Sequence, residues 1–172
     1  LQRPYDFGNE LARIKFSLGW GSWGEYAATR LSASFYPEQI VHFEETFFAA
    51  LEGLDERIDA AMDAFWYDGD GWKCFRAVTG EYDRFFTFTS YLIGHISGLD
   101  GEVDRAPKFK EFFQSGNWLA QYLIELDKVL ESIWSNYGDW KSFEEFNGIG
   151  ELIVLIATTH GVHLTEDGLA IY

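Results

Sequence analysis

The side chains best suited to bind a metal ion lie near the C-terminus, where His160 and His163 are followed by Glu166 and Asp167. Imidazole nitrogens and carboxylate oxygens are ligands that suit Zn²⁺ and similar ions. However, the two histidines lack the i, i+4 spacing of a helical metal motif, and the pattern fixes no third ligand. We therefore predict no metal site here, and we interpret the segment as a turn whose histidines face solvent or cap a strand.

Two acidic segments, 68–71 and 100–111, resemble fragments of calcium-binding loops. A helix–loop–helix calcium loop needs glycine at its sixth position and glutamate at its twelfth. Counted from its first acid, the first segment has Thr79 at the twelfth position, and the second has Arg105 at the sixth. Both segments are therefore better explained as tight acidic turns, and the sequence predicts no metal and no cofactor.

The segment 19–24 reads Gly-Trp-Gly-Ser-Trp-Gly, which we interpret as a loop. It matches neither the phosphate-binding loop nor the nucleophile elbow, because the residues that those motifs need are missing or wrongly spaced. Trp20 and Trp23 could act as stacking platforms for a sugar or a peptide, or they could fold back over the edge of the core. Without a complete catalytic motif, the sequence leans away from an enzyme, although its many carboxylates leave a catalytic pair open.

The formal net charge of −15 is concentrated in two segments of the chain. Residues 37–72 contain ten acidic side chains and one basic one, and residues 111–172 contain ten acidic and two basic ones. Such a protein should repel nucleic acid and anionic membranes and attract a basic protein partner. A simpler interpretation, in which the acidity only keeps an aromatic-rich protein in solution, stays open.

The first candidate binding surface lies on a helix predicted over 38–66, which Gly53 could divide in two. Its apolar residues recur at spacings of three and four, as on the buried face of an amphipathic helix: Ile40, Phe43, Phe47, Leu51, Leu54, Ile58, Ala61 and Phe65. The candidate residues for binding a protein partner lie mostly on the opposite side: Glu45, Glu52, Asp55, Glu56, Asp59 and Asp63.

The remaining pattern favours an α+β fold. Shorter helices are predicted to begin near Pro107, Asn117 and Ser142. Alternating or continuously apolar runs predict strands over 11–18, 30–36, 72–78, 84–93, 152–157 and 169–172, and a helix over 83–96 competes with the fourth of these. Because the strands and helices alternate irregularly, we expect one domain over 1–172, with a mainly antiparallel or mixed sheet packed against several amphipathic helices.

These observations predict a function in binding. We expect an acidic cytoplasmic protein that inhibits or protects against a basic protein partner, in the manner of an antitoxin or immunity protein. The single cysteine, Cys74, fits a reducing compartment, and no apolar run is long enough to span a membrane. Two alternatives remain: a small-ligand binder or enzyme with a pocket near the 19–24 segment or the His160/His163 turn, and a structural or assembly subunit.

Overall fold

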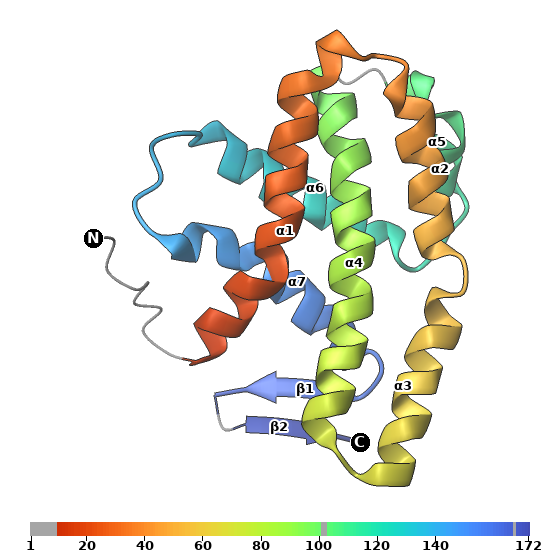
Figure 1. The fold of residues 1–172 in the computed structure, drawn as a ribbon, viewed down its shortest axis with the longest axis vertical. Helices are drawn as coiled ribbons and strands as arrows, with labels where there is room; N and C mark the ends of the chain where they lie inside the picture. Colours follow the sequence, from red (N-terminus) through yellow and green to blue (C-terminus); the bar gives the residue numbers. More distant parts are fainter. Residues whose placement is uncertain (1–9, 101–102, 167) are drawn as a thin grey trace.

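The computed structural model describes residues 10–100, 103–166 and 168–172. These residues form a bundle of helices and one hairpin (Figure 1). The α-helices are α1 (Glu10–Ser32), α2 (Gln39–Leu51), α3 (Leu54–Asp68), α4 (Gly71–Gly98), α5 (Pro107–Gln114), α6 (Ala120–Ser135) and α7 (Asn147–Thr158). Short 3-10 turns are η1 (Ala33–Phe35), η2 (Val103–Arg105) and η3 (Phe143–Phe146), and the antiparallel hairpin pairs β1 (Val162–Thr165) with β2 (Gly168–Ile171).

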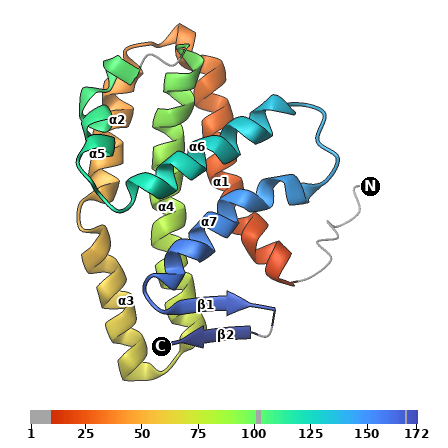
Figure 2. The same ribbon diagram turned by 180° about the vertical axis from the view of Figure 1, so that it is seen from behind.

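Helix α4 is the centre of the molecule. It runs beside α1 on one side and beside α2 and α3 on the other, and these helices form one layer (Figure 1). Helices α6 and α7 cross behind that layer, and the hairpin lies next to the beginning of α4 (Figure 2). Because α4 is covered from several directions, apolar residues are needed around most of its circumference.

The expected α+β fold is wrong, because the structure is 78% helical and the hairpin is the only sheet in the residues described. The segments 11–18, 72–78, 84–93 and 152–157, which were expected to be strands, lie inside α1, α4, α4 and α7 respectively. The competing helix over 83–96 is confirmed within α4. The segment 30–36 forms the end of α1 and the η1 turn, and only the strand over 169–172 is confirmed, as β2.

The errors in the most buried segments have one physical cause. A helix that is covered on several sides has no wide polar face, so its sequence resembles that of a buried strand. Val154 and Ile156 illustrate this, since both are buried although they lie two residues apart on α7. In α1, the alternation of Ile14, Phe16 and Leu18 is satisfied by a helix, because all three are partly buried against the core.

The 19–24 segment is also helical, although glycine in a helix costs about 1 kcal/mol relative to alanine. Close packing explains why position 19 is glycine, because a Cβ atom there would lie 2.7 Å from Ile149 Cβ and 3.0 Å from Gly150 N. Helices α1 and α7 therefore approach each other through glycine, and the tertiary contact overrides the weak local propensity.

The helix predicted over 38–66 is confirmed, and it is divided at Gly53 as α2 and α3. Gly53 has a positive φ of 67°, which glycine adopts at little cost. Phe47, Leu54 and Ile58 of the predicted apolar stripe are fully buried, and Phe43 and Leu51 are partly buried. The break lets the two helices follow α4 along its length (Figure 1).

The acidic turn at 68–71 is confirmed as a junction between two helices. Gly69 ends α3 with a φ of 72°, and the Asp70 side chain caps α4 by accepting a hydrogen bond from Lys73 N. Asp68 pairs with the Lys73 side chain at 2.6 Å. The acids in this turn therefore stabilise the chain reversal between α3 and α4. The other fragment, 100–111, lies partly outside the residues described.

Candidate functional site

The six predicted binding acids are all exposed, and they follow the α2–α3 edge of the molecule. Glu45 lies on α2 and Glu52 lies at the turn between the helices. The other four, Asp55, Glu56, Asp59 and Asp63, lie on α3, on the side opposite its buried Leu54 and Ile58. No ion pair involving any of the six acids is found among the described residues.

Two large aromatic side chains extend this surface. Trp66 and Tyr67 are 64% and 94% exposed, and they lie three and four residues after Asp63. Residues spaced three and four apart on a helix are neighbours on one face. We call this surface the acidic-aromatic face of α3 and define it by Asp55, Glu56, Asp59, Asp63, Trp66 and Tyr67.

Sequence reasoning missed Trp66 and Tyr67. The sequence did contain a signal for them, because both residues lie outside the apolar stripe that ends at Phe65. An aromatic residue outside the buried stripe of an amphipathic helix is expected to be exposed.

Arg57 is the only basic residue in the 37–72 segment, and it is held away from the acidic-aromatic face. Its guanidinium donates to the backbone oxygens of Ala50 and Glu52 at 2.9 and 2.7 Å, where it satisfies carbonyls at the end of α2. Its Nε also pairs with Glu81 Oε2 of α4 at 2.7 Å. These contacts hold the α2–α3 corner, and the ion pair that Arg57 forms is with Glu81 of α4 rather than with an acid of α3.

The predicted His160/His163 turn is separated by the structure into two environments. His160 Nε2 forms a hydrogen bond of 2.6 Å with Tyr82 Oη of α4, and its ring lies 6.2 Å from that of Trp118. Burial lowers the pKa of His160, while the charges of Asp55 and Asp59 oppose this effect. The His163 ring instead packs against Tyr172 at 5.3 Å.

The contact of His160 with Tyr82 joins the C-terminal segment to α4, and no pattern in the sequence predicted it. Burial raises the pKa of Tyr82, and the charges of Asp55 and Asp59 raise it further. Within the described part of the chain, no three His, Cys, Asp or Glu side chains are grouped so that they could hold a metal ion.

Trp20 and Trp23 belong to an aromatic cluster between α1, α6 and η3. Trp23 is 3% exposed and contacts the rings of Tyr26, Trp140 and Phe146 at 5.8, 5.6 and 5.8 Å. Trp20 is 45% exposed and contacts the Phe146 ring at 5.2 Å. Trp23 thus contributes to the core, and Trp20 is the one whose ring reaches the surface.

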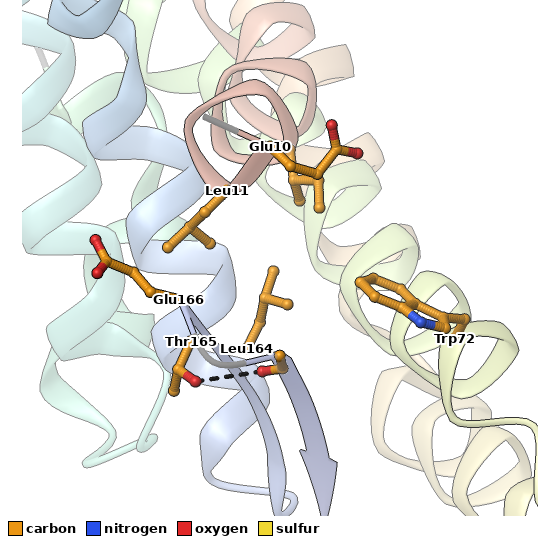
Figure 3. A pocket seen from close by; sticks show the side chains of 8 residues that line it. Glu10, Leu11, Trp72, Leu164, Thr165 and Glu166 are labelled. Atoms are coloured by element: carbon orange, nitrogen blue, oxygen red, sulfur yellow. Dashed lines mark hydrogen bonds between the residues drawn. The ribbon is translucent and has the colours of Figure 1, made fainter. Parts of the chain in front are cut away.

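A pocket of about 480 Å³ lies between the beginnings of α1 and α4 and the hairpin (Figure 3). Leu11 and Leu164 point toward each other across it, and Trp72 lies on the α4 side. Glu10 and Glu166 are the titratable groups of its described lining, and Glu10 already pairs with Arg13. The described lining offers an apolar surface but no paired acid and base for catalysis.

Asp83 of α4 is the carboxylate most strongly affected by burial. Its Oδ1 atom has no hydrogen-bond partner in the described residues, and burial raises its pKa to about 7. Perturbed groups often mark functional sites, but Asp83 lines none of the pockets described above or below. Its physical consequence is a loss of stability rather than an evident reactivity.

Replacing Asp83 by asparagine should raise the free energy of unfolding at pH 8 by about 1–2 kcal/mol. A pKa unit corresponds to about 1.4 kcal/mol, and we reduce the full effect because the side chain is partly exposed. The folded state favours the protonated acid, so the wild type loses stability as pH rises from about 4 to about 7, and the variant does not. Urea melts at pH 4 and pH 8 test this, with exposed Asp63→Asn as the control; an equal effect at both pH values would contradict it.

Comparison of the chain with protein-family models gives no match, and neither curated proteins nor solved structures show a significant similarity. In the residues described, no helix is both long and apolar enough to cross a membrane. The function must therefore be inferred from the side chains themselves.

Proposed function

We propose that the protein binds a basic protein partner through the acidic-aromatic face of α3. The observation that carries the proposal is the coincidence of four exposed acids with Trp66 and Tyr67 on one outward face. Tryptophan and tyrosine are enriched among the residues that contribute most to binding energy at protein interfaces. Acids around such anchors would attract a basic surface and fix its orientation.

The charge of this face supports an interaction rather than a purely solvated surface. Asp55, Asp59 and Asp63 are spaced by four residues, so like charges stand side by side and weaken the helix by a few tenths of a kcal/mol per pair. Nearby lysines would relieve this at little cost, yet the one local cation, Arg57, is committed to the end of α2 and to Glu81. The repulsion is relieved when a cationic partner binds.

The most concrete form of the proposal is an inhibitor of the antitoxin or immunity type that blocks a basic enzyme in the cytoplasm. The buried and single Cys74 fits a reducing compartment. Strong acidity would also disfavour binding of nucleic acid to the same surface.

Reversing the charges of two acids of this face and of the neighbouring Glu52 should slow association with the partner. We expect the variant Glu52→Lys, Asp55→Lys and Asp59→Lys to associate about 10- to 100-fold more slowly at low salt, because electrostatic steering is lost. The difference should shrink as salt rises, since exposed charges are screened. Capture from native lysate identifies the partner, and surface plasmon resonance at several salt concentrations measures the rates.

A matched variant separates a local surface from the overall charge. Glu111, Asp139 and Glu144 are exposed, lie in the other acidic segment, and give the same change in net charge when replaced by lysine. The proposal requires the control variant to associate nearly as fast as the wild type. Circular dichroism must show that both variants are folded. Equal slowing in both variants, or unchanged rates in the first, would reject the acidic-aromatic face of α3 as the binding surface.

A further inference from the structure

A second pocket, of about 330 Å³, lies between α4, α5 and α6. Its walls are apolar and come from two isoleucines of α4, two phenylalanines of α5, and Leu123 and Ile124 of α6. The polar part of its lining consists of Ser97, Asp127 and Glu131. Along α6 the lining therefore changes from aliphatic to acidic over two turns of helix. Its volume is at the lower end of the range for pockets that bind small molecules.

The two acids of this pocket have different surroundings. Glu131 Oε1 accepts a hydrogen bond of 2.8 Å from Tyr26 Oη, and it forms an ion pair with Arg30. Arg30 lies over the ring of Trp134 at 4.5 Å, so aromatic packing holds this cation in place beside Glu131. The charge of Glu131 is thus balanced within the protein.

Asp127 has no such partner. It lies one turn before Glu131 on α6, and no hydrogen bond or ion pair to its carboxylate is found among the described residues. Burial raises its pKa, the charge of Glu131 raises it further, and Arg30 acts in the opposite direction. Asp127 is nevertheless exposed at the rim of the pocket, so an entering ligand can contact its carboxylate. Within the described part of the chain, the Asp127 carboxylate therefore has no direct ion-pair partner in this pocket.

We propose that this pocket binds a small amphipathic amine, with its ammonium group on Asp127 and its apolar body against the α4 and α5 side chains. The charge selects a cation over a neutral molecule or an anion, because a carboxylate at the edge of an apolar wall gains most from an ammonium partner. The volume limits the ligand to on the order of ten non-hydrogen atoms, since one water occupies about 30 Å³ in the liquid. This site is independent of the acidic-aromatic face of α3.

Three ligands of one chain length test the selectivity. n-Octylammonium, 1-octanol and octanoate each contain a straight chain of eight carbons and carry a cationic, a neutral and an anionic head group, respectively. Isothermal titration calorimetry on the whole protein should give n-octylammonium a dissociation constant in the high micromolar to low millimolar range, as expected for so small a ligand. The other two should bind about fivefold more weakly, which corresponds to the upper end of the range for one partly screened ion pair.

Variants then locate the binding. Asp127→Asn keeps the shape of the side chain and should weaken n-octylammonium about fivefold or more while leaving 1-octanol unchanged. Glu125→Gln is the matched control, because Glu125 is an exposed acid on the same helix that does not line the pocket and should leave both ligands unchanged. Ile124→Trp adds bulk at a half-exposed wall position and should weaken both ligands.

Three results would overturn the proposal: no binding of n-octylammonium to the wild type, equal binding of the three ligands, or unaltered n-octylammonium affinity in Asp127→Asn. Thermal melts of each variant establish that an altered affinity does not reflect unfolding. Asp127→Asn leaves the α3 edge intact, so its result bears only on the pocket and not on the proposed protein partner.

Discussion

Replacing Phe47 by alanine should lower the free energy of unfolding by about 3–5 kcal/mol. The Phe47 side chain is fully buried where α2 meets α4 and α5. Its ring makes edge-to-face contacts with Phe109 at 4.9 Å and with Phe112 at 5.4 Å, and it lies 5.5 Å from the Phe85 ring. Its removal leaves a cavity among rigid rings that cannot collapse to fill it, and it also loses the aromatic contacts themselves.

Urea denaturation followed by circular dichroism measures this loss. Val41→Ala provides the control, because Val41 lies on the same helix but is 56% exposed, and it should change stability by less than about 0.5 kcal/mol. If Phe47→Ala cost less than about 1 kcal/mol, the packing of α2 against α4 and α5 described here would be incorrect.

Alanine should have opposite effects at two glycines of α4. At Gly94, a Cβ atom would lie 2.4 Å from the backbone oxygen of Tyr26 and 2.9 Å from its Cα, so α1 and α4 would have to separate. We expect Gly94→Ala to lower the free energy of unfolding by about 1–3 kcal/mol or more, despite the better helix propensity of alanine. At exposed Gly80, a Cβ would meet nothing within 4 Å, and Gly80→Ala should stabilise by up to about 1 kcal/mol.

The comparison is informative because both changes are chemically identical and lie in one helix. Thermal melts of the two variants should therefore shift in opposite directions relative to the wild type. A stabilised Gly94→Ala variant would mean that α1 and α4 are not in the close contact seen here.

The sequence predicted those helices whose solvent side consists mainly of charged residues, and it missed α1, whose exposed residues include Trp20, Gly24, Ala28 and Leu31. The 38–66 segment was recognised because acids occupy one face and apolar residues the other, and Gly53 marked its break. Helices α4 and α7 were not recognised as a whole, because neighbours on several sides remove the polar face from which helical periodicity is read. The Ser142 signal did locate the η3 turn, where Glu145 accepts a hydrogen bond of 3.2 Å from Ser142 N.

Of the two candidate sites, one could be predicted from the sequence and the other could not. The acids of α3 could be found from spacing within one helix, and Trp66 and Tyr67 could have been added by the same reasoning. The amine pocket could not, because its residues come from three helices that are distant in the sequence. Nor could the sequence show that Arg30 pairs with Glu131 rather than with Asp127, since that depends on how α1 crosses α6.

The close approach of α1 and α4 also restricts how the molecule can move. Gly94 faces the backbone oxygen of Tyr26, and Gly98 faces the backbone oxygen of Arg30. The two contacts are therefore four residues apart on both helices. A slide of α4 by one helical turn, about 5.4 Å, in the direction that brings Ser90 to the place of Gly94 would force a hydroxymethyl group against the α1 backbone. Shear between these packed helices is therefore opposed in that direction, whereas the opposite slide would place Gly98 against Tyr26.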